Sequence, residues 1–318
     1  MTRLQHKHYF SDEVQATWRI PSTIEELAHI VRTHSQLSIG NGSPYDLIQS
    51  SRLQRDGKDG SGVYVPYKYD EEHKRHPLTP SVLLDRMNQI VDFSPQDQLV
   101  KVESGAFLSD VNEFLSHSNY EIPAGLREED QEASIGDMVA LNLPHWNMAK
   151  GGSWRDWIVK MKVVLASGEV VISGADVVKN VTGFDLHKLM IGARSTLGVI
   201  AEVTLRIKPV SERREYPPIL LQHGELVVAS PSNFKAICAR LQPEADKGSL
   251  EWYCDEASGL ILAEQTRLFE DIPHFAWRSH VYENALQEFS ETEKKLMRRT
   301  KEIFDPTNKL NPGEFGFI

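Results

Sequence analysis

The sequence predicts an α+β fold, because strand and helix patterns follow one another without the regular alternation of a wound parallel sheet. A long strand begins at Val199, with every second residue from Val199 to Ile207 apolar and facing one side. Apolar runs at 158–165 and 170–172 flank the turn sequence 166–169, which is the pattern of a hairpin. The segment 107–115 instead spaces its apolar residues for one face of a helix.

The remaining elements of the first two thirds of the chain are shorter. A capping box that starts at Ser22 predicts a helix over 23–34, with Leu27, Ile30 and Val31 as its apolar stripe. Residues 51–80 form a polar insertion, expected to be a surface loop with one strand at 63–65. Further strands are predicted at 37–39, 82–85, 90–93 and 99–103.

The last third of the chain divides at two points. Residues 209–218 interrupt the apolar periodicity and are predicted to be a linker. A second capping box, which starts at Ser290, predicts a terminal helix that ends near Asp305-Pro306. We therefore expect a large domain over 1–210, a small mixed domain over 211–285 and a C-terminal segment over 286–318.

Composition excludes several classes of function. Lysine and arginine number 35 against 45 aspartates and glutamates, so the formal net charge is −10 and nucleic acid is not an expected partner. No apolar run approaches the roughly 20 residues that a membrane span requires. The first residues lack the apolar core of a secretion signal, so we expect a cytoplasmic protein.

Metal chemistry is not expected in this chain. Cys238 and Cys254 are its two cysteines, and a four-thiolate iron–sulfur cluster requires twice as many. The pairs His6/His8 and His73/His76 have metal-like spacing, but neither comes with a recognisable third ligand. Any iron–sulfur centre that works with this protein must therefore belong to another chain.

Three segments have the composition of loops that surround a phosphate. Close approach of a pyrophosphate to backbone N–H groups requires glycine or small residues, because larger side chains block it. Gly40-Asn41-Gly42-Ser43 follows a predicted strand, Ser134-Ile135-Gly136-Asp137 opens a second small-residue segment, and 192–198 reads GARSTLG. Each segment alone is also compatible with an ordinary turn.

These segments resemble the FAD-binding domain of the vanillyl-alcohol-oxidase, or PCMH-type, superfamily. The wording KNVTGFDL at 179–186 is similar to that of bacterial glycolate oxidase, and the chain as a whole resembles its smaller FAD-binding subunit. The ending FDPTNKLNPG at 304–313 is similar to the family ending, which returns to the flavin domain. The resemblance implies a two-subdomain FAD-binding fold with a reduced cap domain, and FAD held without a covalent bond.

The resemblance also implies a set of cofactor-binding positions and three departures from the family pattern. Ile39 stands in place of an arginine, Asn41 in place of a glycine, and Asp137 in place of a second glycine. Because a carboxylate facing a pyrophosphate would be repulsive, we expect Asp137→Gly to bind flavin more tightly. The implied positions are Ile39, Gly40, Asn41, Gly42, Ser43, Ser134, Ile135, Gly136, Asp137, Val139, Ala140, Asn142, Arg155, Gly192, Thr196, Gly198, Val199, Ile200 and Asn311.

By the same resemblance, this chain is an FAD-dependent oxidoreductase subunit. We expect it to oxidise a small 2-hydroxy acid such as glycolate, or to relay the electrons of that reaction, beside a catalytic flavin subunit and an iron–sulfur subunit. No catalytic residue is identified, and His187 is expected to face solvent. The alternative is a noncatalytic structural subunit with a degenerate flavin site. A UDP-sugar reductase is disfavoured, because the C-terminal ending belongs to the oxidase side of the family.

Overall fold

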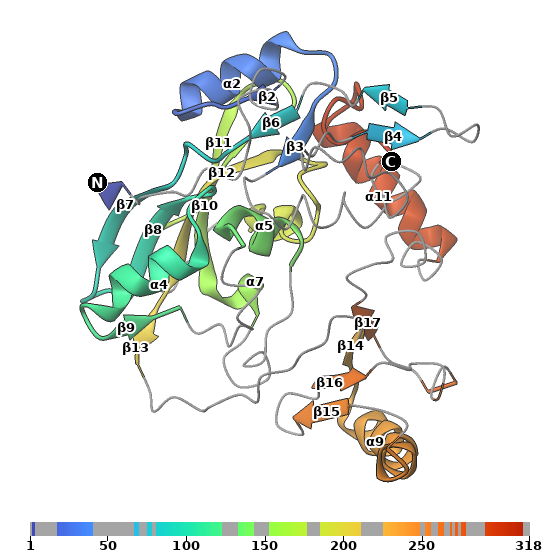
Figure 1. Ribbon diagram of the computed structural model, residues 1–318. Helices are drawn as coiled ribbons and strands as arrows, with labels where there is room; N and C mark the ends of the chain where they lie inside the picture. The colour runs from blue at the N-terminus through green and yellow to red at the C-terminus, as the bar shows by residue number, and fades with distance from the viewer. Residues whose placement is uncertain are drawn as a thin grey trace.

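A computed structural model shows the α+β content that the sequence predicts (Figure 1). It describes residues 2–3, 18–40, 67–69, 75–77, 81–122, 133–142, 153–176, 185–210, 225–248, 252–255, 260–263, 268, 271–272, 275–277 and 290–313. The predicted strand at 63–65 and most of the predicted linker at 209–218 lie outside these residues.

A six-stranded antiparallel sheet forms the centre of the larger part of the chain. The predicted hairpin is confirmed, with Lys160 opposite Gly174 and Val164 opposite Val170. In spatial order the strands are β1 (Thr2–Arg3), β7 (Gln89–Ser94), β8 (Leu99–Glu103), β12 (Val199–Arg206), β10 (Ile158–Val164) and β11 (Val170–Gly174).

The strands of this sheet contribute to two separate hydrophobic cores. The first core includes Leu108, Ile135 and Trp154, from the helices α4 (Leu108–Ser116), α5 (Ile135–Ala140) and α7 (Trp154–Trp157). The second core includes Leu27 of α2 (Ile24–Thr33) and Leu310 near the C-terminus. Residues far apart in the chain are thus drawn to one sheet by burial of apolar surface.

β12 does not keep the strict alternation that its sequence predicts. Lys162 pairs with Glu202 while Val163 pairs with Ile200, so Ala201 is an extra residue and forms a bulge. Val199 and Ala201 therefore pack in the second core, whereas Val203 packs in the first together with Ile200. Because of the bulge, Val203 lies on the opposite face of the sheet from Val199 and Ala201, although strict alternation would place all three on one face.

The N-terminal helix begins one residue later than the sequence predicts. The N-cap of α2 is Thr23, whose hydroxyl accepts a hydrogen bond from Glu26 N at 3.1 Å. Glu26 in turn accepts from Ser22 N at 2.7 Å, so the reciprocal capping pattern is present but shifted. The box at Ser290 is confirmed, and α11 runs over Glu291–Phe304.

Next to α2, three short strands form a parallel sheet that the sequence pattern did not predict as a unit. β6 (Ser81–Leu83) lies between β2 (Trp18–Arg19) and β3 (Ser38–Gly40). Ile39 pairs with Val82 and Gly40 with Leu83. The carboxyl end of β3 is thus a paired strand whose last residue, Gly40, opens the first glycine segment.

A separate four-stranded sheet, with α9 (Pro231–Asp246), has a core of its own that includes Val227, Ile237 and Ile261. Its strand order is β15 (Trp252–Asp255), β16 (Leu260–Ala263), β14 (Glu225–Val228) and β17 (Phe275–Trp277). Within the ranges that the structure describes, no helix is long and apolar enough to cross a membrane. The remaining elements are β4 (Tyr67–Tyr69), β5 (Arg75–Pro77), β9 (Tyr120–Glu121), α8 (His187–Met190) and β13 (Lys208–Pro209).

Candidate functional site

The candidate site lies where the C-terminal segment returns to β3. In Figure 1, the red helix α11 and the blue strand β3 lie near each other although they come from opposite ends of the chain. Leu310 and Leu37 form a parallel bridge. Leu37 N donates to Lys309 O at 2.8 Å, and Asn311 N donates to Leu37 O at 2.9 Å. The C-terminal segment thereby pairs alongside the chain at Leu37, just before β3 and the first glycine segment.

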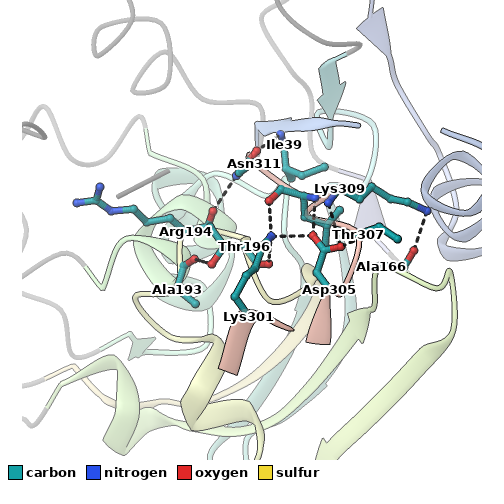
Figure 2. Close-up of polar contacts among 11 residues, drawn as sticks. Ile39, Ala166, Ala193, Arg194, Thr196, Lys301, Asp305, Thr307, Lys309 and Asn311 are labelled. Carbon is teal, nitrogen blue, oxygen red and sulfur yellow. Dashed lines mark hydrogen bonds and ion pairs between the residues drawn. The ribbon is translucent and has the colours of Figure 1, made fainter. Parts of the chain in front are cut away.

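The side chain of Asn311 joins the first glycine segment to the third. Its Oδ1 accepts from Ile39 N at 2.7 Å, and its Nδ2 donates to Arg194 O at 2.7 Å (Figure 2). Asn311 has a left-handed backbone with φ of 46°, which asparagine tolerates better than most residues. The structure thus brings the predicted positions Ile39 and Asn311 together with the 192–198 turn.

A buried ion pair between Lys301 and Asp305 stabilises this junction. Lys301 Nζ donates to Asp305 Oδ2 at 2.7 Å, to Leu310 O at 2.7 Å and to Thr196 O at 2.8 Å. Asp305 also accepts from the backbone N–H groups of Leu310 at 2.7 Å and Lys309 at 2.9 Å. Lys301 is 4% exposed and Asp305 is 1% exposed, so the pair is almost fully removed from water.

Burial and hydrogen bonding shift the pKa values of both partners. Desolvation lowers the pKa of Lys301 from its ordinary 10.5, although the hydrogen bond to Asp305 acts to raise it. Desolvation acts to raise the pKa of Asp305, but the N–H groups of Leu310 and Lys309 and the ammonium of Lys301 lower it below 3.8 overall. At neutral pH the carboxylate is therefore charged and fully engaged.

Lys309 ties the same segment to two further parts of the chain. Its Nζ donates to Val31 O at 2.8 Å, near the end of α2, and to Ala166 O at 2.9 Å, in the turn between β10 and β11. We call Lys301, Asp305, Lys309 and Asn311 the C-terminal clasp. The sequence reasoning singled out Asn311 but missed the two lysines, since a Lys and an Asp four positions apart near a helix end are common.

The 192–198 turn has a strained backbone. Arg194 and Ser195 have φ of 51° and 56°, and Gly192 has φ of 78°. A left-handed conformation costs a non-glycine residue about 1–2 kcal/mol, so two in succession require support from their surroundings. That support comes through carbonyl groups: Asn311 donates to that of Arg194, and Lys301 to that of Thr196.

The second predicted segment starts as a helix whose first N–H groups are already used. Ser134 is the N-cap of α5, and its hydroxyl accepts from Asp137 N at 3.1 Å. Ile135 N donates to Ala106 O and Gly136 N to Ser104 O, each at 2.8 Å. These three donors bond within the protein, so they do not point at a pyrophosphate in this conformation.

The carboxylate of Asp137 also bonds inside the protein. Asp137 is 1% exposed, and its Oδ2 accepts from Ser134 Oγ at 2.8 Å. The expected repulsion of a pyrophosphate is therefore not what this geometry shows. The carboxylate instead stabilises the start of α5.

Asp137→Gly is therefore not expected to bind flavin more tightly, contrary to the prediction from sequence. The variant removes a buried hydrogen bond and places glycine in a helix, which together should lower the free energy of unfolding by about 1–2 kcal/mol. FAD affinity, measured by fluorescence titration, should stay unchanged or fall. Tighter binding would show that the carboxylate does oppose the phosphates.

The second and third segments are held against each other. Gly192 N donates to Val139 O at 3.0 Å, and Arg194 N donates to Ala140 O at 2.9 Å. A Cβ built on Gly192 would lie 3.3 Å from Cβ of Asn142. The predicted positions Val139, Ala140 and Asn142 thus adjoin the strained turn, which the clasp joins to β3.

Other predicted positions serve packing or lie elsewhere. A Cβ on Gly198 would come 2.4 Å from Val163 Cγ1, so this glycine allows β12 and β10 to approach each other. Val199 and Ile200 are fully buried in the two cores. Arg155 is exposed on α7. The predicted positions Asn41, Gly42 and Ser43 lie outside the described residues, as do Lys179 and Asn180.

Two buried polar atoms indicate whether a polar ligand fits the candidate site. The sequence analysis did not identify either of them. Among the described residues, Asn88 Oδ1 and Ser104 Oγ have no hydrogen-bond partner. Both lie on loops that connect to the predicted segments: Gly105 N donates to Met87 O, and Ser104 O accepts from Gly136 N, each at 2.8 Å. Because an unsatisfied buried polar atom costs stability, the two atoms fit a site whose ligand supplies partners. A flavin dinucleotide carries both donors and acceptors.

His187 does not face solvent as expected from the sequence. It is 3% exposed, its N donates to Ser173 Oγ at 3.0 Å, and its Nδ1 lies 3.2 Å from the same hydroxyl. The residue begins α8, and its contacts with Ser173 hold it against the end of β11. Burial lowers the pKa of His187 from 6.5, although the charge of Asp185 acts to raise it.

The buried histidine predicts a pH dependence of stability. Its folded pKa lies below its unfolded pKa, so the unfolded chain binds more protons as pH falls below 6.5, and stability falls with it. His187→Gln should therefore lose less stability than the wild type between neutral and acidic pH. Urea denaturation across this range measures the difference, and parallel curves would contradict the prediction.

Comparison with known proteins identifies two matched regions. The family described as "FAD binding domain" matches residues 75–174, and the family described as "FAD linked oxidases, C-terminal domain" matches residues 283–315. The second match contains the whole C-terminal clasp.

Individual relatives and solved structures were also found. A D-lactate dehydrogenase of Anaerostipes hadrus is 31% identical over 196 residues, which is 56% of this chain and 39% of the relative. Glycolate oxidase subunit GlcE of Escherichia coli (strain K12) is 30% identical over 145 residues, covering 44% of this chain and 41% of the subunit. A solved alkyldihydroxyacetonephosphate synthase matches with a TM-score of 0.46 at 16% identity, covering 91% of this chain and 44% of the synthase.

The matched part spans about two fifths of the length of these relatives. Among the described residues, no group of three or more His, Cys, Asp or Glu side chains is placed to hold a metal ion.

Proposed function

We propose, from the premise that this chain belongs to the PCMH-type family of FAD-linked oxidases, that it is the flavin-binding subunit of a 2-hydroxy-acid oxidoreductase. FAD is the cofactor of this family. The observation that carries the proposal is the meeting of the C-terminal segment, which matches the oxidase family, with the turns that resemble flavin loops. The two relatives named above are a D-lactate dehydrogenase and a glycolate oxidase subunit, and both names refer to 2-hydroxy acids.

The flavin would lie along the end of β3, the 192–198 turn and the loops that carry Asn88 Oδ1 and Ser104 Oγ. When bound, FAD would supply the electron-accepting chemistry that 2-hydroxy-acid oxidation requires. Asn88 and Ser104 would offer one acceptor and one hydroxyl to its polar groups. Arg194 and Ser195 would present a fixed backbone surface, since the clasp bonds the carbonyls of Arg194 and Thr196.

We propose that the flavin is held without a covalent bond. His29 and His34 are the histidines nearest in sequence to the first glycine segment. His29 lies within α2, and Nδ1 of His34 already bonds to Ile30 O at 2.9 Å. We therefore propose neither ring as a point of covalent attachment.

Among the described residues of the site we assign no group as the base that removes the hydroxyl proton. For this reason we propose that the chain relays electrons within a complex, beside a catalytic flavin subunit and an iron–sulfur subunit. The likeness to GlcE, a subunit by its name, supports this assembly. We also propose that the domains of this chain are bounded at 1–210, 211–285 and 286–318.

The visible absorption spectrum of the purified protein, followed by acid release and chromatography of the flavin, tests the proposal. We expect stoichiometric FAD in the supernatant. A yellow protein would then be screened for reduction by glycolate and D-lactate, alone and with candidate partner subunits. A colourless protein that takes up no added FAD would overturn the proposal and leave the noncatalytic structural subunit.

A further inference from the structure

The C-terminal clasp connects parts of the chain that lie far apart in the sequence. The side-chain nitrogens of Lys301, Lys309 and Asn311 all end on backbone carbonyls, and those carbonyls belong to three separate segments. The segments are the end of α2, the β10–β11 turn and the 193–196 turn. Asn311 also joins a fourth segment, because its Oδ1 accepts a hydrogen bond from the N–H of Ile39 in β3.

Lys301 has no hydrogen available for a ligand. Its ammonium carries three N–H donors, and the carboxylate of Asp305 and the carbonyls of Leu310 and Thr196 use all three. In Figure 2 its side chain reaches up from α11 into the junction, so that the ammonium is enclosed by these acceptors. Lys301 can therefore affect a bound flavin through the backbone that it holds, not by touching it.

The 192–198 turn, which Lys301 helps to hold, has a strained backbone that would relax without support. Arg194 and Ser195 are both left-handed, a conformation that non-glycine residues leave when nothing holds them. Lys301 and Asn311 bond the carbonyls of Thr196 and Arg194, on either side of Ser195. Without these bonds the turn would sample right-handed conformations, and the backbone surface beside β3 would change shape.

We propose that Lys301 is a positioning residue, which keeps the 193–196 turn and the start of β3 in the one arrangement that receives the flavin. This inference rests on the proposed function only for the identity of the ligand. A site that is formed in advance binds more tightly, because the ligand does not have to order the protein. The clasp therefore makes flavin affinity depend on a side chain that the flavin does not touch.

Lys301→Met tests the inference, because methionine keeps much of the apolar stem and removes the ammonium. Lys294→Met is the matched control on the same helix, where Lys294 forms an exposed pair with Glu291 at 3.0 Å. If the competent turn falls to about a tenth of the population, the dissociation constant for FAD should rise about tenfold in Lys301→Met. The control should bind like the wild type.

Two further measurements separate positioning from general destabilisation. Hydrogen exchange of the flavin-free protein should increase more at 192–198 and 37–40 than in the strands β7, β8 and β10 in Lys301→Met. The visible band of the bound flavin should also lose vibronic structure, which reports a less rigid environment. Uniform loss of protection across the sheet, or unchanged FAD affinity with unchanged exchange, would overturn the inference.

A second variant covers the case in which Lys301→Met does not fold. Asn311→Asp keeps the acceptor for Ile39 N but turns a carboxylate oxygen toward Arg194 O, and it leaves the ion pair intact. It should deprotect the 192–198 turn selectively, and a turn that stays protected would overturn the inference. If the wild type binds no FAD, the proposed function fails, and selective exchange at the two segments still decides whether the clasp positions them.

Discussion

Asp305→Leu should lower the free energy of unfolding by about 3–5 kcal/mol, because it leaves the buried ammonium of Lys301 without its counter-charge. Lys301 is 4% exposed, and its two remaining carbonyl partners are neutral. The N–H groups of Leu310 and Lys309 lose their acceptor at the same time. Urea denaturation of the variant and the wild type measures the loss.

An exposed ion pair provides the control for this variant. Arg240 and Asp271 pair on the surface, with side chains 44% and 67% exposed, so Asp271→Leu should leave the free energy of unfolding almost unchanged. The double variant Lys301→Met/Asp305→Leu should be more stable than Asp305→Leu alone, since no unpaired charge is left buried. Equal losses in Asp305→Leu and Asp271→Leu would contradict the role of burial.

The same variant has a defined pH dependence. The pKa of Asp305 is lower in the folded chain than its ordinary 3.8, so its contribution to stability is present above 3.8 and disappears as pH falls through the folded value. The stability difference between wild type and Asp305→Leu should therefore be largest near neutral pH and shrink on strong acidification. A difference that is constant with pH would show that the carboxylate charge is not what stabilises the junction.

Gly105→Ala should be the most damaging glycine substitution near the site. A Cβ at this position would lie 2.0 Å from Leu84 O and 2.8 Å from Met87 O. Both contacts are with backbone, which must move as a whole, so we expect a loss of about 3 kcal/mol or more. The displaced loop carries Ser104 and adjoins Asn88, so FAD affinity should fall as well.

Gly248→Ala is the matched control, because it separates backbone conformation from collision. Gly248 has φ of 71°, but a Cβ there would meet nothing within 4 Å. Its substitution should cost about 1 kcal/mol, the price of a left-handed alanine. Thermal unfolding of both variants makes the comparison, and similar losses would show that the loop of Leu84 and Met87 can yield.

Local signals were sufficient for most individual elements. The hairpin of β10 and β11, the helix α4 and the capping box at Ser290 all depend on residues within a few positions of one another. Periodicity and capping act over such distances, so these elements can be predicted from the sequence. The shift of the α2 cap from Ser22 to Thr23 shows the limit, since neighbouring hydroxyl residues can serve equally well.

The candidate site depended on contacts that no local pattern records. The residues Ile39 and Asn311 are 272 positions apart, and Lys301 lies 105 positions from Thr196. The burial of His187 and the inward carboxylate of Asp137 likewise follow from which neighbours cover them. From sequence came the α+β class, the family resemblance and the presence of a flavin loop set. The tertiary structure alone decided which backbone groups remain free and which side chains hold the loops, because burial and long-range hydrogen bonds exist only once the chain has folded.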